Sequence, residues 1–424
     1  MINLLGAASD AADMTHVVGG RRPDQSADGV LRDLAVQGVR YALLRPPTTS
    51  RSDVDIVVHP ADVSALATFL QSKRLVATPS RRHWPHRFFA RFDGNRWLVI
   101  DALNRVVIRG AWLGGRRLAA DLASRSMVGP DGVRRLAKVD REWATLLHAA
   151  LGAKTTDVQA ITDIEPPSEC TGPLASALDA RAGGDVSRRI VAALANGDLT
   201  TATALAHIVR DAAVPRSVRA LVLLARWLDR SPNPVIRRRG RTTGCTVALL
   251  GPDGAGKSTL AAGIREALPL PVHLIYMGVF RTDARQRAWR RIPGGGLAIR
   301  LCRLWWRSTR ARYHRSRGHL VVFDRYVFDA NLRPGRRALR ARLSYWLLER
   351  SCPQPDLVLL LDAPGTVMFA RKNEHDVQVL EERRRHYLTM AARLPQAHVI
   401  DATMSREQVL DAATAHIWKA LTTE

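Results

Sequence analysis

Apolar and polar residues alternate along the first hundred positions in short runs that are typical of a small mixed domain. Residues 31–39 and 61–73 place apolar side chains at helical spacing, which predicts two helices. The runs 41–45 and 55–58 are short and apolar, which predicts two strands. Two more apolar runs flank Asp93-Gly94, a dipeptide that favours a tight hairpin turn. Residues 28–105 therefore predict an α+β unit.

The pattern changes after residue 140. Helical spacing continues to about residue 229 with a break at 166–168, and residues 231–244 are rich in proline, glycine and arginine, as linkers are. From residue 245 onward, apolar strand-like runs alternate with helical segments, which predicts an α/β fold with a parallel sheet covered by helices. We therefore expect a loose N-terminal arm (1–27), an N-terminal domain (28–139), a helical segment (140–230), a basic linker (231–244) and a C-terminal domain (245–424).

The most informative stretch is GPDGAGKST, residues 251–259, which follows a predicted strand and begins a predicted helix. It fits the phosphate-loop pattern G-x4-G-K-[ST] in the context that this pattern requires. Glycines let successive backbone N–H groups point at a phosphate, and the helix start adds the positive end of its dipole. Lys257 would reach the β- and γ-phosphates of ATP, and the Ser258 hydroxyl would bind Mg²⁺. The expected nucleotide-binding residues of the loop are Gly251, Gly254, Ala255, Gly256, Lys257, Ser258 and Thr259.

Two later strands end in an acidic residue, Asp324 after HLVVF and Asp362 after LVLLL. Open parallel sheets bind their ligands at the carboxyl ends of the strands, so we expect both carboxylates to face the nucleotide. One of them would hold Mg²⁺, directly or through water, and the sequence leaves open which one. The alternative for each is a helix cap with no role in binding.

Four motifs resemble the thymidylate kinase family over about residues 243–424: GPDGAGKST, FDRY, PDLVLLLD with a following arginine, and ERRRHY. In that family the acidic residue inside the loop lies near the acceptor and the metal, which implies this role for Asp253. An Asp-Arg pair places its arginine on the acceptor phosphate, which implies Asp324 and Arg325. A basic lid contacts ATP, and Arg371 stands at its start beside Lys372. The resemblance implies ATP- and Mg²⁺-dependent phosphoryl transfer with these catalytic residues: Lys257, Asp253, Arg325 and Asp324.

The segments that would form the acceptor pocket differ from that family. Residues 276–291 replace an Arg-Glu-Pro-Gly stretch, residues 327–337 replace an Ala-Tyr-Gln stretch, and Thr366 stands where the family has glutamate. The identity of the acceptor is therefore open. A nucleoside monophosphate is the first choice, thymidylate included, and a sugar or another small metabolite is the alternative.

A second group of acidic residues lies in the N-terminal domain. Asp53 and Asp55 would project from the same face of a strand, and Asp101 on a neighbouring strand would complete a cluster of three metal-binding carboxylates. Metal ions held in this way can clamp a phosphoryl displacement. The pattern resembles nucleotidyltransferases of the DNA polymerase β type over about residues 30–150, without the Gly-Ser element of that superfamily. Three interpretations stay open: an active nucleotidyltransferase, an inactive or substrate-presenting domain, and coincidence.

The formal charge of +25 implies an anionic partner. Nineteen arginines and only four acidic residues fall within residues 281–350, the Arg-rich segment. Inside it, residues 297–313 predict a helix with one basic face. That face consists of Arg300, Arg303, Arg307 and Arg310. Three interpretations remain: a covering helix whose aromatic residues join the core, a surface for anionic membrane, and a surface for nucleic acid.

Other features bear on metal binding and compartment. The four cysteines are widely spaced and no Cys/His cluster occurs, so we predict no structural zinc site and assign no role to histidines such as His86, His314 and His319. Sparse cysteine, the lack of a long apolar run and the lack of a secretory signal lead us to expect a cytoplasmic protein. The leading prediction is a kinase fused to a nucleotidyltransferase-like domain. The alternatives are a bifunctional enzyme that acts on a small metabolite, and a nucleotide-gated NTPase that binds membrane or nucleic acid.

Overall fold

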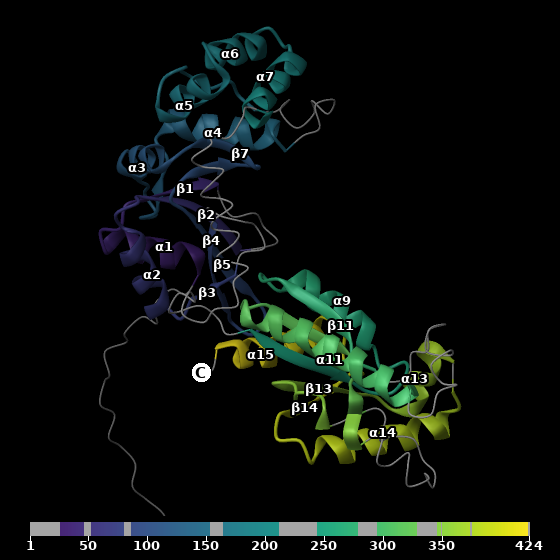
Figure 1. Ribbon diagram of the computed structural model, residues 1–424. Helices are drawn as coiled ribbons and strands as arrows, with labels where there is room; N and C mark the ends of the chain where they lie inside the picture. The colour runs from purple at the N-terminus through teal and green to yellow at the C-terminus, as the bar shows by residue number, and fades with distance from the viewer. Residues whose placement is uncertain are drawn as a thin grey trace, which may run out of the picture.

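The computed structural model describes residues 26–45, 52–79, 86–152, 164–211, 244–278, 295–328, 346–348, 350–373 and 375–422. The expected N-terminal arm up to residue 25, the end of the helical segment and the linker (212–243) lie outside the described residues. So do residues 279–294, 329–345 and 349 of the Arg-rich segment. The described residues form a mixed α/β fold with two large sheets, and the N-terminal sheet lies between the helices α5–α7 (residues 173–211) and the C-terminal sheet (Figure 1).

The N-terminal domain is built on a seven-stranded sheet in the order β3-β4-β5-β2-β1-β9-β8. Its strands are β1 (Tyr41–Arg45), β2 (Ser52–Val58), β3 (Val76–Thr78), β4 (His86–Phe92), β5 (Trp97–Leu103), β8 (Met127–Val128) and β9 (Arg134–Arg135). The predicted hairpin joins β4 to β5, with Gly94 at a φ of 95°. Helices α1 (Ala27–Val36) and α2 (Val63–Ser72) share a core with one face of this sheet.

A group of helices shares a core with the other face. It consists of α3 (Arg116–Ser124), α4 (Lys138–Ala150), α5 (Pro173–Ala182), α6 (Val186–Ala195) and α7 (Leu199–Asp211), together with the hairpin of β6 (Val106–Ile108) and β7 (Ala111–Gly114). Trp143 is fully buried at its centre, and its indole Nε1 donates a hydrogen bond to the Glu169 carbonyl over 3.0 Å. The helical segment is therefore packed onto the N-terminal sheet as one continuous core.

The C-terminal domain has five parallel strands in the order β11-β12-β10-β13-β14. They are β10 (Cys245–Leu250), β11 (Val272–Tyr276), β12 (Leu320–Asp324), β13 (Leu357–Asp362) and β14 (Ala397–Asp401). The sheet is covered by α9 (Lys257–Ala267) and α15 (Arg406–Thr422) on one face and by α11 (Gly295–Ser316) and α14 (Val377–Ala391) on the other; α13 (Gly365–Lys372) follows β13. Successive residues of β10 alternate between the two cores, which explains why the strands are apolar throughout.

Apolar contacts join the two domains. Ala90 and Val99 of the N-terminal sheet are buried in the same cluster as α9 and α15. The rings of Trp97 and Trp418 meet edge to face with centroids 4.9 Å apart. Figure 1 shows α15 beside the end of the N-terminal sheet that carries β3. The C-terminal sheet is thus placed by packing as well as by the chain connection.

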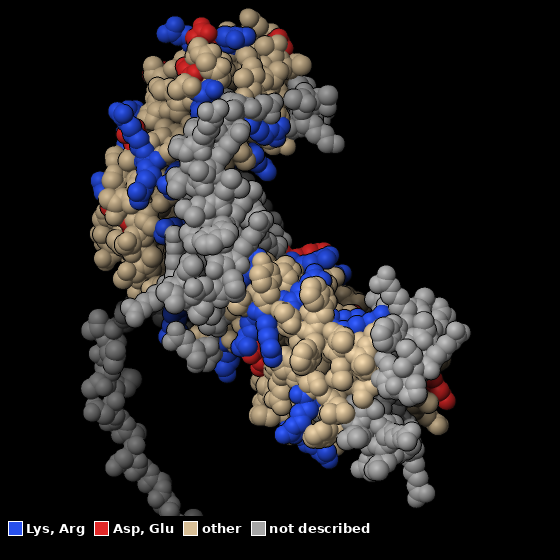
Figure 2. Space-filling model, in the orientation of Figure 1, with Lys and Arg blue, Asp and Glu red and all other residues tan. Residues whose placement is uncertain are grey.

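The surface carries more basic than acidic side chains, as the composition predicts. On the face shown in Figure 2, lysine and arginine side chains are spread over both domains, and acidic side chains are few. In the part of the chain that is described, no helix is both long enough and apolar enough to cross a lipid bilayer.

Candidate functional site

The loop between β10 and α9 has the strand–loop–helix arrangement that its sequence predicts. Gly251, Gly254 and Gly256 have φ values of 142°, 89° and 95°, a region that favours glycine. A Cβ atom on Gly254 would lie 2.6 Å from the Met368 carbonyl oxygen, and one on Gly251 would lie 2.8 Å from that of Leu361. The loop therefore needs glycine at these two positions for close packing against α13 and β13, and at Gly256 for its backbone conformation.

The functional groups of the loop lie at the start of α9. The Lys257 ammonium donates hydrogen bonds to the carbonyl oxygens of Gly251 and Pro252 over 2.7 and 2.6 Å. Ser258 and Thr259 are exposed in the first helical turn, where backbone N–H groups and the positive end of the helix dipole also lie. This end of α9 can accept an anion of the size and charge of a phosphate.

Asp253, inside the loop, is surrounded by basic side chains from two other parts of the chain. Its Oδ1 accepts a hydrogen bond of 2.6 Å from Arg325 Nη2. Its Oδ2 lies 3.6 Å from Arg383 Nη1 and 3.8 Å from His375 Nε2. Only the family resemblance implied a role for Asp253 and Arg325, and the structure places their side chains in direct contact.

Arg325 also has an unusual backbone. Its φ of 62° lies in the left-handed region, which costs a residue with a side chain about 1–2 kcal/mol. It directly follows Asp324, the last residue of β12, which is paired in register with β10 and β11. Strain of this kind persists only where the surroundings impose it, and it concentrates at functional sites.

Asp362, at the end of β13, is held by a different arginine. Arg384 donates to Asp362 Oδ1 from Nε over 2.6 Å and to Oδ2 from Nη2 over 2.9 Å. Arg384 also donates to Glu381 over 2.9 Å, and both acidic partners raise the pKa of its guanidinium. A hydrogen bond from the Gly365 N–H, with that from Arg384, lowers the pKa of Glu381. Direct binding of Mg²⁺ to Asp362 would therefore have to replace hydrogen bonds to Arg384.

The remaining predicted residue of the lid, Arg371, reaches across the same edge of the sheet. Its Nη2 donates to the Ala402 carbonyl over 3.0 Å, which ties α13 to the turn after β14. The predicted site residues of the C-terminal domain thus gather around the carboxyl ends of the parallel strands. Sequence reasoning assigned no role to His375, Glu381, Arg383 or Arg384, although ERRRHY, which contains both arginines, was one of the four motifs.

Comparisons with known proteins give limited similarity. No family model matches the chain, and no curated protein matches it. Among solved structures, a thymidylate kinase from Candida albicans is similar at 18% identity and a TM-score of 0.35, over 42% of this chain and 92% of that one. We base no functional argument on similarity at this level, so the function has to be argued from the site itself.

Helix α11 lies beside this site with its apolar residues against the sheet and its tryptophans outward. Trp305 and Trp306 are 67% and 72% exposed, whereas Leu304 is buried, so the expectation that the aromatic residues join the core is wrong for both tryptophans. Arg307 places its guanidinium 5.5 Å from the ring centre of Tyr276, at the carboxyl end of β11. Arg303 and Arg300, about one and two turns before Arg307, are half-buried as well. Helix α11 therefore carries three partly buried arginines, one of which lies at the carboxyl end of β11.

The N-terminal acidic residues lie within strands rather than in loops. Asp55 of β2 and Asp101 of β5 are partners in a parallel register, so they are neighbours on one face of the sheet. Asp101 is 4% exposed and its Oδ2 lies 2.7 Å from His86 Nδ1, a contact that the sequence did not indicate. Its Oδ1 is buried with no hydrogen-bond partner among the described residues. Asp53 is in register with Val99, two positions before Asp55 on its strand.

Proposed function

We propose that the C-terminal domain transfers the γ-phosphoryl group of ATP to a small anionic acceptor, with a nucleoside monophosphate, thymidylate included, as the first choice. The observation that carries this proposal is the contact between Asp253 in the phosphate loop and the strained Arg325 after β12. It puts a basic side chain within reach of a second phosphate, directly beside a loop suited to the first.

The residues of the loop would act by position and charge. Lys257 would exchange the two carbonyl oxygens that it contacts for oxygens of the β- and γ-phosphates. An oxygen of the acceptor would form a bond to the γ-phosphorus as the bond from that phosphorus to ADP breaks. Arg325 and Arg383 would hold the acceptor phosphate, and Arg325 would also stabilise the charge that develops during transfer. Asp253 would position both arginines.

The oxygen-bearing side chains present fit Mg²⁺, which prefers oxygen ligands. Ser258 is exposed at the start of α9, and Asp324 ends a strand next to β10, so these two residues would hold the ion. Asp362 would contribute through water, because both of its oxygens already accept hydrogen bonds from Arg384. When bound, Mg²⁺ would neutralise part of the triphosphate charge. Arg371 would help to shape the nucleotide side of the site.

The partly buried arginines of α11 support an acceptor with negative charge. Arg307 is stacked near Tyr276, and Arg300 and Arg303 lie further toward the start of the helix. Arginine suits the bidentate recognition of phosphate, and a tyrosine ring next to it offers a surface on which a planar base can stack. A nucleoside monophosphate provides both groups, whereas a sugar phosphate provides only the first.

The test is an acceptor screen with the full chain, ATP and Mg²⁺. We expect ADP to form only with a specific acceptor, and Lys257→Ala to lower kcat by roughly 10²–10³-fold. Lys419→Ala is the matched control, because Lys419 is an exposed lysine of the same domain on α15. ADP production that needs no acceptor and is stimulated by liposomes or polynucleotide would replace the kinase with the nucleotide-gated alternative. Full turnover by Lys257→Ala would rule out both.

A second activity is proposed for the N-terminal domain: metal-dependent nucleotidyl transfer. Its support is the register that makes Asp55 and Asp101 neighbours, together with the buried oxygen of Asp101 that accepts no hydrogen bond within the described ranges. A carboxylate oxygen in this position is suited to a hard cation. The two domains would then form a bifunctional enzyme that phosphorylates a metabolite and nucleotidylates it.

A further inference from the structure

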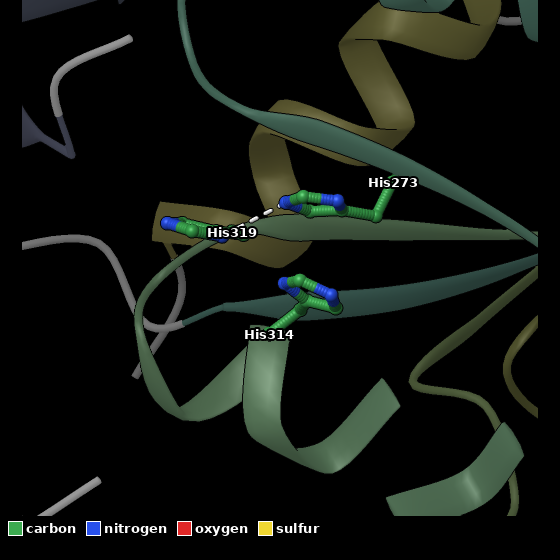
Figure 3. A group of neighbouring side chains, drawn as sticks. All are labelled: His273, His314 and His319. Atoms are coloured by element: carbon green, nitrogen blue, oxygen red, sulfur yellow. Dashed lines mark hydrogen bonds between the residues drawn. The ribbon is translucent and has the colours of Figure 1, made fainter. Parts of the chain in front are cut away.

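Three histidines meet at the edge of the C-terminal sheet that is opposite the phosphate loop. His273 is the second residue of β11, His314 lies in the last turn of α11, and His319 immediately precedes β12 (Figure 3). The parallel register of β11 and β12 places this group at the amino ends of the strands, whereas the phosphate loop follows the carboxyl end of β10. The group is therefore separate from the nucleotide site.

The three rings are close enough to share one ion. His273 Nε2 and His319 Nδ1 are 3.0 Å apart, and the rings of His273 and His314 are stacked with centroids 3.6 Å apart. One nitrogen from each residue lies within 4.8 Å of the other two. Tetrahedral zinc with Zn–N distances of 2.0–2.1 Å places its nitrogens about 3.3 Å apart, and the stacked rings would turn so that their nitrogen lone pairs, which lie in the ring planes, converge on the ion.

The hydrogen bonding of the three histidines also indicates that they bind a ligand. His314 Nδ1 is buried and has no hydrogen-bond partner within the described part of the chain. His319 is only 9% exposed. A buried imidazole nitrogen without a partner is unfavourable, and a metal ion would satisfy it.

The electrostatic surroundings favour neutral imidazole, the form that binds metals. Burial, helped by the positive charges of Arg310 and Arg317, lowers the pKa of His273. Burial, with the same two arginines and His273, lowers the pKa of His314 to about 4. The arginines also repel a dication, but Arg310 is exposed and Arg317 is partly exposed, so solvent and salt screen this repulsion.

We propose that His273, His314 and His319 form a binding site for a divalent transition-metal ion, with Zn²⁺ as the first choice. Three imidazoles suit Zn²⁺, Cu²⁺ and Ni²⁺ and do not suit Mg²⁺, and water would fill the fourth position. The ion would fasten the end of α11 to β11 and β12. Because α11 carries Arg307 at the other edge of the same sheet, metal binding would stabilise the helix that faces the acceptor.

The test uses the full chain after treatment with a chelator. Titration with Co²⁺, followed by visible absorption, and with Zn²⁺, followed by calorimetry, should give one site. Zn²⁺ should also raise the melting temperature, whereas Mg²⁺ should produce neither signal. His314→Gln and His273→Gln should each weaken binding about tenfold or more and remove the rise in melting temperature.

The matched control is His416→Gln, because His416 forms another stacked histidine pair in the same domain, with His398 and centroids 4.2 Å apart. It should leave the metal affinity unchanged. Circular dichroism of the metal-free variants checks that each is folded. Absence of a cobalt spectrum, equal binding by both cluster variants and the wild type, or a spectrum of cobalt bound to cysteine thiolate would overturn the proposal. None of these readouts involves ATP, so the result is independent of the proposed kinase activity.

Discussion

The N-terminal and C-terminal sheets each bring acidic residues together, but they surround these residues with different groups. In the C-terminal domain, Asp253 meets two arginines and a histidine, and Asp362 meets Arg384 through both of its oxygens. In the N-terminal domain, Asp55 lies beside another acid, Asp101, whose Oδ2 contacts a histidine. The first arrangement places arginines on each carboxylate, whereas the second places two carboxylates side by side and a histidine on one of them.

This difference has consequences for what each site can bind. Arginines whose acidic partner positions them in a loop or on a helix can move to a phosphate, so the C-terminal site suits anions. Neighbouring carboxylates within strands cannot separate, and they are stabilised by a cation between them. Their places in the fold also differ, because Asp253 lies in a loop and Asp362 ends a strand, whereas Asp55 and Asp101 lie within strands. If both proposals hold, the same residue type serves opposite partners in the two domains.

The largest expected effect comes from Arg325→Gly. This variant removes the guanidinium that contacts Asp253 but keeps a residue suited to a φ of 62°. We expect kcat to fall by roughly 10²–10³-fold, with a melting temperature equal to or above that of the wild type. Acceptor-dependent ADP formation and a thermal melt measure the two quantities.

The N-terminal domain provides the control for this experiment. Arg109 also has a positive φ, 49°, in an exposed turn between β6 and β7. Arg109→Gly should relieve backbone strain in the same way and leave turnover unchanged. If both variants lose activity equally, or if Arg325→Gly keeps full activity, the strain at Arg325 does not mark the acceptor site.

The second prediction concerns the carboxylates of the N-terminal sheet. Asp55→Asn removes one charge from the pair with Asp101, so we expect Mn²⁺ affinity to fall about tenfold or more in the absence of nucleotide. Asp33→Asn is the control, since Asp33 on α1 is paired with Lys73. Paramagnetic resonance of free Mn²⁺ follows the titration. Equal affinity in wild type and Asp55→Asn would leave the domain without a metal site at these residues.

The features of the two domains that could be predicted from the sequence are those that depend on local residue spacing. The phosphate loop needs glycines within six positions, and the alternation of strand residues puts Asp53 and Asp55 on one face, to which the pairing of β2 with β5 adds Asp101. The parallel C-terminal sheet followed from its apolar strands, because strands buried on both faces tolerate few polar residues. Each of these features depends on neighbours along the chain or on one strand pairing.

Features that depend on distant segments could not be predicted in the same way. Arg383 reaches Asp253 from 130 positions away, and only the family resemblance drew attention to its motif. The three clustered histidines are 41 and 5 positions apart, spacings that match no metal-binding pattern. Trp305 points outward because the opposite face of α11 meets the sheet. The helical periodicity of the sequence alone allowed either a buried or an exposed Trp305.

A smaller effect distinguishes binding from catalysis within the C-terminal site. Arg383 lies 3.6 Å from Asp253, further than Arg325, so it is expected to contribute to acceptor binding rather than to the transition state. Arg383→Ala should raise the KM for the acceptor about tenfold with little change in kcat. Arg385→Ala, an exposed arginine two positions along α14, should change neither. A fall in kcat with unchanged KM would instead assign Arg383 to the transfer step.

The smallest effect tests whether an aspartate–arginine pair outside the site behaves only as a structural contact. Arg40 donates to both carboxylate oxygens of Asp62, over 2.8 and 2.9 Å, and its hydrogen bonds lower the pKa of Asp62 from 3.8 to about 2. A lowered carboxyl pKa stabilises the folded state above pH 3.8, and this contribution disappears as the pH falls toward 2. Asp62→Asn should therefore lower the melting temperature by about 2 °C or less at pH 7, and by a vanishing amount near pH 2. Turnover should be unchanged, in contrast to Arg325→Gly. A difference in melting temperature that persists at pH 2 would show that the pair acts through packing rather than through charge.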